Sequence, residues 1–313
     1  MRKGLSHIYS FSVGLRNSLY DLDILKASIV VPFVISIGNI EAGGTGKTPF
    51  TIALALALKD RGYRVCIVTR GYKGRRKGTM LVSAQHSAKD VGDEALLMAR
   101  LTGLPVIKSP DRLAGATYAS RELAAEIIIL DDAFQHRRIH RDYNICLVST
   151  RLDQEALLPL GCLREGASAL KRADLVVSTK DSSSGSLTAD LVAVGLVDRF
   201  GNPVMRQIAG DVLAFCGIAK PESFFQLIKA SGARVDTMRF RDHHPYTRGD
   251  IRRIRWRARG KDLIITTEKD LIRLMPEQLD GRWHALRVKM EIPELDRIIE
   301  EIETRVKNRR ISR

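Results

Sequence analysis

Apolar positions recur along the chain in two distinct patterns. Short β-branched and aliphatic runs of the kind found in buried strands occur at Val31–Ile37, Arg64–Thr69 and Glu126–Leu130. Longer segments with helical spacing, such as Pro49–Asp60 and Asp111–Leu123, lie between them. Apolar strands separated by helices of roughly 10–15 residues predict βαβ units and a mostly parallel sheet with helices on both faces.

A second αβ series follows residue 210. Its predicted strands and helices alternate in the order 212–217, 221–230, 234–240, 247–259 and 262–267. We therefore predict an α/β protein with a three-layer α/β/α domain over residues 1–205 and a smaller α/β/α domain over residues 206–313. Periodicity does not decide whether the last helix, about 293–309, returns to the first domain.

Apolar residues near the N-terminus lie on one predicted helical face. They recur at three- and four-residue steps, at Ile8, Phe11, Leu15, Leu19 and Leu22. Such a stripe is ordinarily core packing. A basic start beside an apolar, aromatic face also suits a membrane interface with anionic headgroups. No uninterrupted apolar run approaches the roughly 18 residues of a spanning helix, so we do not expect one.

The charge balance narrows the class of partner. The 313 residues include 51 Lys and Arg against 36 Asp and Glu, a formal net charge of +15. This excess predicts an anionic partner: nucleic acid, a phosphorylated small molecule or an acidic membrane surface. The four cysteines form no CxxC pair, which gives zinc and redox motifs little support and fits a reducing compartment.

A glycine-rich segment between a predicted strand and a predicted helix has the pattern of a phosphate-binding loop. Its residues are Gly43, Gly44, Thr45, Gly46, Lys47 and Thr48. Glycines let backbone N–H groups turn toward phosphate oxygens, and the helix adds its positive N-terminal end. We expect Lys47 to reach the β- and γ-phosphates and Thr48 to bind Mg²⁺, so the first domain is predicted to be P-loop NTPase-like.

Two adjacent acids supply the expected partner of this loop. Asp131 and Asp132 end the apolar strand that begins near Glu126. Mg²⁺ prefers a few carboxylates together with waters and phosphates, so we predict that both acids hold the metal. The guanine-binding motif Asn-Lys-x-Asp is not present in the most similar segment, Ser178–Asp181. The lack of this motif favours ATP over GTP as the nucleotide.

Several blocks, in order along the chain, resemble the tetraacyldisaccharide 4′-kinase (lipid A 4′-kinase) family. The blocks are residues 36–39, 43–49, 69–72, 92–94, 110–112, 131–136, 163–165, 242–246 and 266–270. The resemblance implies two α/β/α domains joined by a short strand linker, with ATP in the cleft. It implies transfer of the γ-phosphate of ATP to the 4′-hydroxyl of tetraacyldisaccharide 1-phosphate, an acylated glucosamine disaccharide lipid, in lipid A biosynthesis. It also implies a peripheral or N-terminally anchored protein on the cytoplasmic face of the bacterial inner membrane.

The resemblance assigns a proton acceptor. It implies that Asp93 is the catalytic carboxylate and that His243 pairs with it, a combination able to take a proton from a sugar hydroxyl. From its own context, Gly92-Asp93-Glu94, Asp93 is instead typical of a helix N-cap. Whether His243 or His244 pairs with Asp93 stays open, although the order of the blocks favours His243.

Further polar residues match positions that line the family's active site. The resemblance implies that Arg112 and Arg164 neutralise phosphate charge during transfer, which suits the bidentate guanidinium. It places Gln135, His136 and Glu165 around the nucleotide.

The chain departs from the family pattern at three positions. Glu41, Ala133 and Gly166 replace residues that the family usually has. Of the three, Glu41 is the most unexpected, because an acid beside a triphosphate repels it unless it points away or meets a basic neighbour.

Two other functions remain to be weighed against a lipid kinase. A membrane-associated P-loop ATPase switch without a sugar acceptor would share Lys47, Thr48 and Asp131 but would not need Asp93 with His243. A nucleic-acid-dependent ATPase is the weakest, because no nucleic-acid-binding module or set of stacking aromatics is present. With a lipid substrate, we predict no nucleic acid partner, and we predict that residues 6–22 and 70–77 face an anionic inner-membrane surface.

Overall fold

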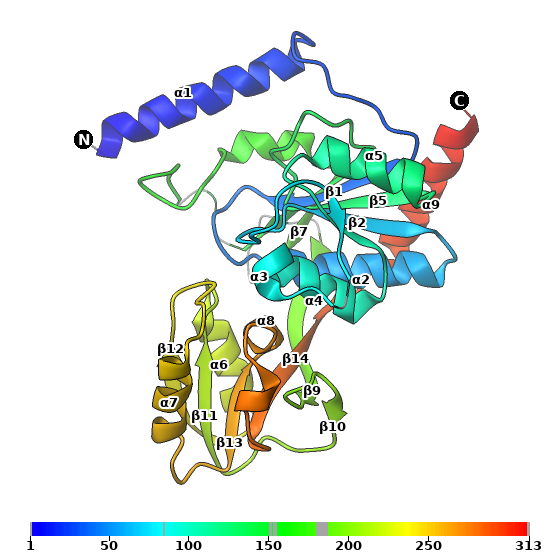
Figure 1. Ribbon diagram of the computed structural model, residues 1–313. Coiled ribbons are helices and arrows are strands. Elements are labelled where there is room, and N and C mark those ends of the chain that lie inside the picture. Colours follow the sequence, from blue (N-terminus) through cyan, green and yellow to red (C-terminus); the bar gives the residue numbers. More distant parts are fainter. Residues whose placement is uncertain (1, 84, 150–151, 153–154, 180–186, 312–313) are drawn as a thin grey trace.

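The structure, a computed structural model, describes residues 2–83, 85–149, 152, 155–179 and 187–311. Two sheets organise the chain, and Figure 1 shows them one above the other, each with its own helices. The predicted α/β class is therefore confirmed. The loop predicted at residues 182–186 lies outside the described residues.

The first sheet has eight strands in the order β3-β4-β2-β5-β1-β6-β7-β8. All neighbouring strands in it are parallel except β3, which runs antiparallel to β4. The strands are β1 (Phe33–Asn39), β2 (Val65–Thr69), β3 (Met80–Leu81), β4 (Val106–Lys108), β5 (Ile127–Asp131), β6 (Tyr143–Val148), β7 (Leu175–Ser178) and β8 (Leu187–Thr188). Strands β1, β2 and β5 are buried along their whole length, as their continuous apolar runs predict.

Helices cover both faces of this sheet. They are α2 (Lys47–Asp60), α3 (Ala88–Val91), α4 (Asp93–Thr102), α5 (Arg112–Glu122) and α9 (Leu295–Ile311), with a 3₁₀ turn, η2, at Ala167–Arg172. Alternate residues of β1 face opposite sides: Ile35 packs in a core with α2, α4 and α9, and Val34 in a core with α5. The C-terminal helix α9 thus belongs to the first domain, where Ile298 and Ile302 are buried.

The second sheet has six strands in the order β10-β9-β14-β13-β11-β12. The strands are β9 (Asp190–Val197), β10 (Pro203–Val204), β11 (Asp211–Cys216), β12 (Arg234–Arg239), β13 (Leu263–Thr267) and β14 (Trp283–Glu291). Helix α6 (Pro221–Lys229) covers one face and α7 (Arg248–Arg257) the other. The short α8 (Glu268–Leu271) follows β13, and a 3₁₀ turn, η3, spans Pro276–Gln278. Strands β9 and β10, which precede the boundary predicted at 205/206, pair within this sheet.

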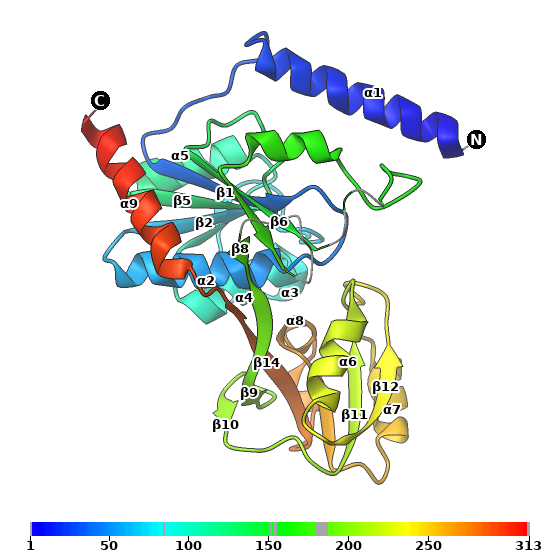
Figure 2. The same cartoon turned by 180° about the vertical axis from the view of Figure 1, so that it is seen from behind.

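Strands β9 and β14 also connect the two domains. They pair antiparallel from Asp190 opposite Glu291 to Val197 opposite Ala285, and both run from one domain into the other (Figure 2). Met290 of β14 packs in the first domain's core, and its methyl carbon would lie 2.7 Å from a Cβ placed on Gly46. The linker therefore touches the segment predicted to bind phosphate.

Helix α1 (Arg2–Asp21) lies apart from both sheets (Figures 1 and 2). Polar contacts hold it: the Tyr9 hydroxyl donates to the carbonyl oxygen of Arg164 at 3.0 Å, and Arg137 pairs with Asp21 at 2.7 Å. Its apolar stripe is not in a core. The most exposed members of that stripe, 50–71% exposed, are Ile8, Phe11, Leu15 and Leu22. Core packing is thus the wrong interpretation of the stripe, and no helix in the described part of the chain is long and apolar enough to cross a membrane.

Candidate active site

The predicted phosphate-binding loop lies at the carboxyl edge of the first sheet. It follows β1 and leads into α2, which begins at Lys47 and has Thr48 in its first turn. The side-chain amide of Asn39, the last residue of β1, donates to the Thr45 hydroxyl at 2.9 Å. Gly46 has φ +82°, a backbone conformation that glycine adopts without strain. Ligands of open α/β sheets bind at this edge, so the loop stands where its motif requires.

Asp131 ends β5 in the same edge and is fully buried among hydroxyl donors. Thr51 and Thr69 donate to its two carboxylate oxygens at 3.3 and 3.1 Å. Burial, followed by the charges of Glu94 and Asp132, raises the pKa of Asp131 to about 7. A cation beside this carboxylate favours its ionised form.

Asp132 turns toward the basic side chains of the site. Its φ of +49° is uncommon for a residue with a side chain. Its carboxylate lies 3.4 Å from Nζ of Lys47 and 3.1 Å from Nη1 of Arg164. Burial opposes ionisation, but Lys47 and Arg164 hold the pKa of Asp132 below its ordinary value.

The oxygen donors here fit Mg²⁺. The hydroxyl of Thr48 and the carboxylates of Asp131 and Asp132 are hard ligands, the kind that Mg²⁺ takes while keeping waters and phosphate oxygens. Within the described part of the chain, no group of three His, Cys, Asp or Glu side chains forms an all-protein metal cage. The acidic pair therefore suits a metal that arrives with a phosphorylated ligand.

Three other predicted site residues lie beside this edge. Arg112 is buried, donates to the backbone oxygen of Asp131 at 3.4 Å, and has its pKa lowered by that burial. Gln135 donates to the backbone oxygen of Asn39 at 2.7 Å. Among the described residues, the buried Nε of Arg112 and Nε2 of His136 have no hydrogen-bond partner within the protein.

Glu165 has a different set of contacts from the one implied by the resemblance. Its buried carboxylate pairs with Arg16 of α1 at 3.1 Å and also with Arg172. Both oxygens are therefore engaged by arginines, which suits an anchor for α1 better than a nucleotide contact.

The structure brings Asp93 and His243 together across the domain boundary. Asp93 begins α4 in the first domain, and its Oδ2 lies 2.8 Å from Nδ1 of His243 in the second. Both side chains are largely buried, at 4% and 9% exposure. His244 instead lies 3.1 Å from Asp250, near the start of α7. Of the two histidines, His243 is the one placed to act with Asp93.

His243 is held in an unusual backbone conformation. Its φ is +56°, and its N–H donates to the carbonyl oxygen of Gly217 at 3.0 Å. The ring of Tyr72 packs edge-on against its imidazole, with centroids 5.1 Å apart, and Lys73 donates to the backbone oxygen of Asp242 at 3.3 Å. The loop at 70–77, which we predicted at the membrane, therefore contacts the second domain through these two residues.

Sequence reasoning missed three charged residues next to this pair. Nζ of Lys269 donates to Glu94 at 2.9 Å and lies 3.3 Å from Nε2 of His243. Nε of Arg273 lies 3.3 Å from Oδ2 of Asp93. Lys269 sits in one of the blocks that carried the family resemblance, residues 266–270, which was the available signal.

The carboxylate of Glu41, the most unexpected departure from the family pattern, is engaged by other residues of the protein. It is buried, and its two oxygens accept from the backbone N–H and hydroxyl of Ser149 at 2.6 and 2.8 Å. Lys220 of the second domain lies 4.0 Å away. The Glu41 carboxylate therefore has hydrogen-bond donors in Ser149 and a basic neighbour in Lys220.

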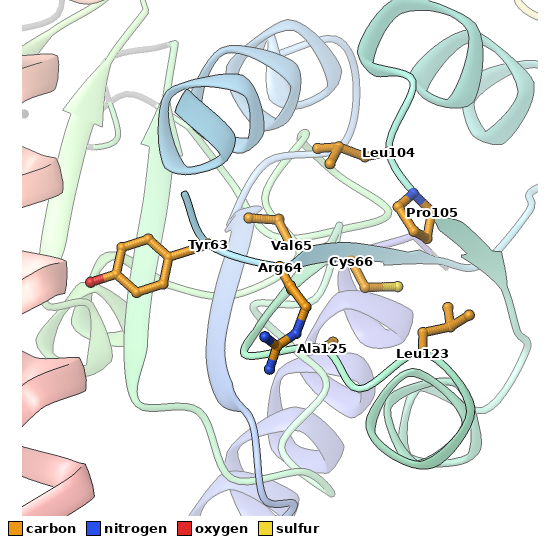
Figure 3. Close-up of a pocket in the computed structure, with 8 residues that line it drawn as sticks. All are labelled: Tyr63, Arg64, Val65, Cys66, Leu104, Pro105, Leu123 and Ala125. Atoms are coloured by element: carbon orange, nitrogen blue, oxygen red, sulfur yellow. The ribbon is translucent and has the colours of Figure 1, made fainter. Parts of the chain in front are cut away.

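The pocket drawn in Figure 3 lies at the opposite edge of the sheet. Its walls come from residues just before and at the starts of β2, β4 and β5, including Val65, Pro105 and Ala125. The conserved chemistry of α/β folds gathers at the carboxyl ends, so this pocket is separate from the site described above.

Comparisons with known proteins agree with this geometry. The family model described as tetraacyldisaccharide-1-P 4′-kinase matches residues 3–307. Proteins named tetraacyldisaccharide 4′-kinase are similar to this chain: one from Syntrophus aciditrophicus is 37% identical, covering 87% of this chain and 83% of its own. Another, from Koribacter versatilis, is 33% identical and covers 95% of this chain and 96% of its own length. The crystal structure of LpxK from Aquifex aeolicus in complex with ATP superimposes with a TM-score of 0.80, at 34% identity over 97% of each chain. The chain therefore belongs to the tetraacyldisaccharide-1-P 4′-kinase family, the kinases of lipid A biosynthesis.

Proposed function

We propose that this chain transfers the γ-phosphate of ATP to the 4′-hydroxyl of tetraacyldisaccharide 1-phosphate through the residues described above, at the surface of a membrane. The observation that carries the proposal is the contact between Asp93 and His243 across the domain boundary. A sugar hydroxyl must give up its proton during transfer, and a carboxylate oriented by an imidazole can accept it.

The phosphate end of the reaction belongs to the first domain. Backbone N–H groups of residues 43–48 and the start of α2 would hold the phosphates, with Lys47 at the transferring group. Mg²⁺ held by Thr48, Asp131 and Asp132 would neutralise charge on the phosphate oxygens. Arg164, already beside Asp132, would stabilise the charge that develops during transfer.

We assign proton transfer to Asp93. Its carboxylate would accept the proton of the 4′-hydroxyl as the sugar oxygen bonds to the γ-phosphorus. The bond from that phosphorus to the β–γ bridging oxygen breaks, and ADP leaves with the electron pair. Glu94, the next residue of α4, contributes to the raised pKa of Asp131, so the start of α4 is electrostatically coupled to Asp131.

The membrane part of the proposal rests on α1. This helix carries basic, aromatic and aliphatic residues and has an exposed apolar stripe. Polar contacts hold its other side to the first domain. Such a helix lies in a membrane interface with its apolar face toward the acyl chains. This arrangement would bring a lipid acceptor to the enzyme without a spanning helix.

The test uses the full chain with ATP labelled in its γ-phosphate and the disaccharide 1-phosphate lipid in mixed micelles. We expect label on the sugar, and none when the acceptor lacks its 4′-hydroxyl. Label released only as inorganic phosphate, at a rate indifferent to the lipid, would instead identify an ATPase switch.

A further inference from the structure

A charged cluster outside the phosphate-binding machinery surrounds the Asp93–His243 pair. It comes from α8 and the turn after it, in the second domain, and it faces the start of α4 in the first. Its two basic members, Lys269 and Arg273, are partly buried, with side chains 19% and 8% exposed. Burying two cations costs free energy unless each meets carboxylates, so their partners indicate what they do.

Lys269 contacts the pair through the imidazole. Its ammonium donates to Glu94 at 2.9 Å and lies 3.3 Å from Nε2 of His243. Burial opposes the charge, but Glu94 and Asp93 raise the pKa of Lys269 above its ordinary value, so it is an ammonium at neutral pH. An ammonium has three N–H donors and no lone pair. Nε2 of His243 must therefore be the acceptor in this contact.

This contact assigns the tautomer of the imidazole. A neutral histidine carries one ring proton, and with Nε2 accepting from Lys269 that proton sits on Nδ1. Nδ1–H then donates to Oδ2 of Asp93 across 2.8 Å. In the opposite tautomer, the Nε2–H would point at the ammonium of Lys269, and two donors would face each other. Nδ1 would then face the Asp93 carboxylate with no proton between the two acceptors. Lys269, acting at the opposite ring nitrogen from Asp93, thus favours the form of His243 that can orient Asp93.

Arg273 contacts the pair through the carboxylate. Its Nε lies 3.3 Å from Oδ2 of Asp93, and its Nη2 lies 3.0 Å from Oδ1 of Asp270, which is fully buried. Asp270 is fixed in turn by the hydroxyls of Tyr246, at 2.7 Å, and Thr267, at 2.6 Å. The guanidinium therefore bridges an immobile acid of the second domain and the acid at the start of α4.

We propose that Lys269 and Arg273 are positioning residues for proton transfer, Lys269 by setting the tautomer of His243 and Arg273 by orienting Asp93 across the domain boundary. The inference rests on the proposed function, because it assigns a role toward the base of that reaction. Neither residue needs to touch ATP or the sugar. The second domain in this view is a scaffold that completes the base of the first.

The charged groups around Asp93 come from both domains. His243, Lys269 and Arg273 face it from the second domain, and Glu94 follows it in α4. Asp242 lies 3.8 Å from Nε2 of His243. Burial opposes ionisation of Asp93, while the hydrogen bond from His243 and the charges of Lys269 and Arg273 lower its pKa.

Two variants separate the two roles. In Lys269→Met, we expect kcat to fall roughly 10- to 100-fold, the usual cost of losing a group that orients a histidine, while KM for ATP changes little. The ¹⁵N chemical shifts of the His243 ring should report Nδ1–H in the parent and a larger share of Nε2–H in the variant.

In Arg273→Gln, the acidic limb of the kcat–pH profile should move up by about one pH unit, because a cation beside Asp93 is lost. Arg273→Lys should restore that limb by restoring the charge.

Arg287→Gln is the matched control. Arg287 lies 2.8 Å from Glu268 on the same short helix, and within the described part of the chain its polar contacts are with Glu268 and the backbone oxygen of Gly201. Its loss should lower the melting temperature without moving the tautomer or the pH profile. If Lys269→Met and Arg273→Gln behave like this control, the two residues are only structural and the inference is overturned. An Nε2–H tautomer in the parent chain would overturn it as well.

Lipid phosphorylation tests the proposed function, whereas the α8 variants and the ring tautomer test the roles of Lys269 and Arg273. A parent chain that phosphorylates the lipid and loses that activity in Asp93→Asn upholds the function, whatever the α8 variants do. A parent chain with no lipid phosphorylation, or an Asp93→Asn variant with normal activity, rejects the function itself. The ring tautomer is measured without any turnover, so it tests Lys269 in either case.

Discussion

Nδ1 of His243 lies 2.8 Å from Oδ2 of Asp93, although the two residues stand 150 positions apart and belong to different domains. The contact ties the start of α4 to the second domain. Under the proposed function, the proton acceptor and the imidazole that orients it therefore come from two different domains.

Replacing Asp93 by Asn tests the base. The amide keeps the shape of the side chain but cannot take up the proton, so we expect lipid phosphorylation to slow roughly 10²–10⁴-fold. Binding of ATP should persist, since the phosphate-binding loop is untouched. Initial rates with the lipid acceptor and equilibrium binding of a fluorescent ATP analogue measure the two effects. Asp296→Asn, which changes an exposed acid on α9, should leave both unchanged.

Replacing Lys47 by Met tests the phosphate-binding loop. The ammonium sits 3.4 Å from Asp132, at the start of α2, where it would meet the transferring phosphate. Removing one charge-stabilising donor from a preorganised site costs about 10²–10³-fold in rate. Lys59→Met, at the other end of α2, is the control and should keep its activity. Normal turnover in Lys47→Met would reject the assignment of the loop.

Replacing Phe11 and Leu15 by Ser tests the membrane face of α1. Both side chains are at least half exposed, at 71% and 50%, so the change should not disturb a core. Flotation with anionic vesicles should show weaker binding, because apolar area that would enter the interface is lost. Activity on a water-soluble, short-chain acceptor should stay near normal. His7→Ser, a polar change on the same helix, should bind vesicles like the parent, and equal flotation of all three proteins would count against α1 as the attachment surface.

Replacing Glu41 by Ala tests the buried acid beside the phosphate-binding loop. The change leaves the backbone N–H of Ser149 without its acceptor and removes the carboxylate near Lys220. An orphaned buried donor costs about 1–3 kcal/mol, so the denaturant midpoint should fall. Glu277→Ala, at an exposed position, should leave the midpoint within error. A midpoint equal to the parent's in Glu41→Ala would show that these contacts contribute little.

The pH dependence of cysteine labelling follows from burial. Burial raises the pKa of the thiols of Cys66 and Cys146 to about 12, and burial with Glu155 raises that of Cys162 to about 11. The thiolate is the reactive form, so a raised pKa leaves little of it at pH 8, and reactivity grows as pH rises. We expect iodoacetamide to modify the half-exposed Cys162 before the two buried thiols. Unfolding restores the ordinary pKa near 8.5 and should make all of them react quickly, as peptide mass spectrometry would show.

Local sequence was enough to predict most helices and strands of both domains and the phosphate-binding edge, although it did not predict β9 and β10. Strand periodicity, a glycine-rich turn and an acid at a strand end depend on neighbours a few residues apart. The carboxyl ends of parallel strands share one edge, so the loop after β1 and Asp131 at the end of β5 had to meet. The family resemblance added the identity of Asp93 and His243, which no local pattern distinguishes from a helix cap and a turn.

Only the tertiary structure decided contacts between distant segments. It paired His243 rather than His244 with Asp93, placed Lys269 and Arg273 beside them, and turned Glu41 toward Ser149. It also left the stripe of α1 outside any core, which periodicity cannot foresee, because an amphipathic helix looks the same whether its apolar face meets a protein or a lipid. Side chains more than a hundred residues apart meet only after both domains have folded, and the electrostatics of a buried site are set by that meeting.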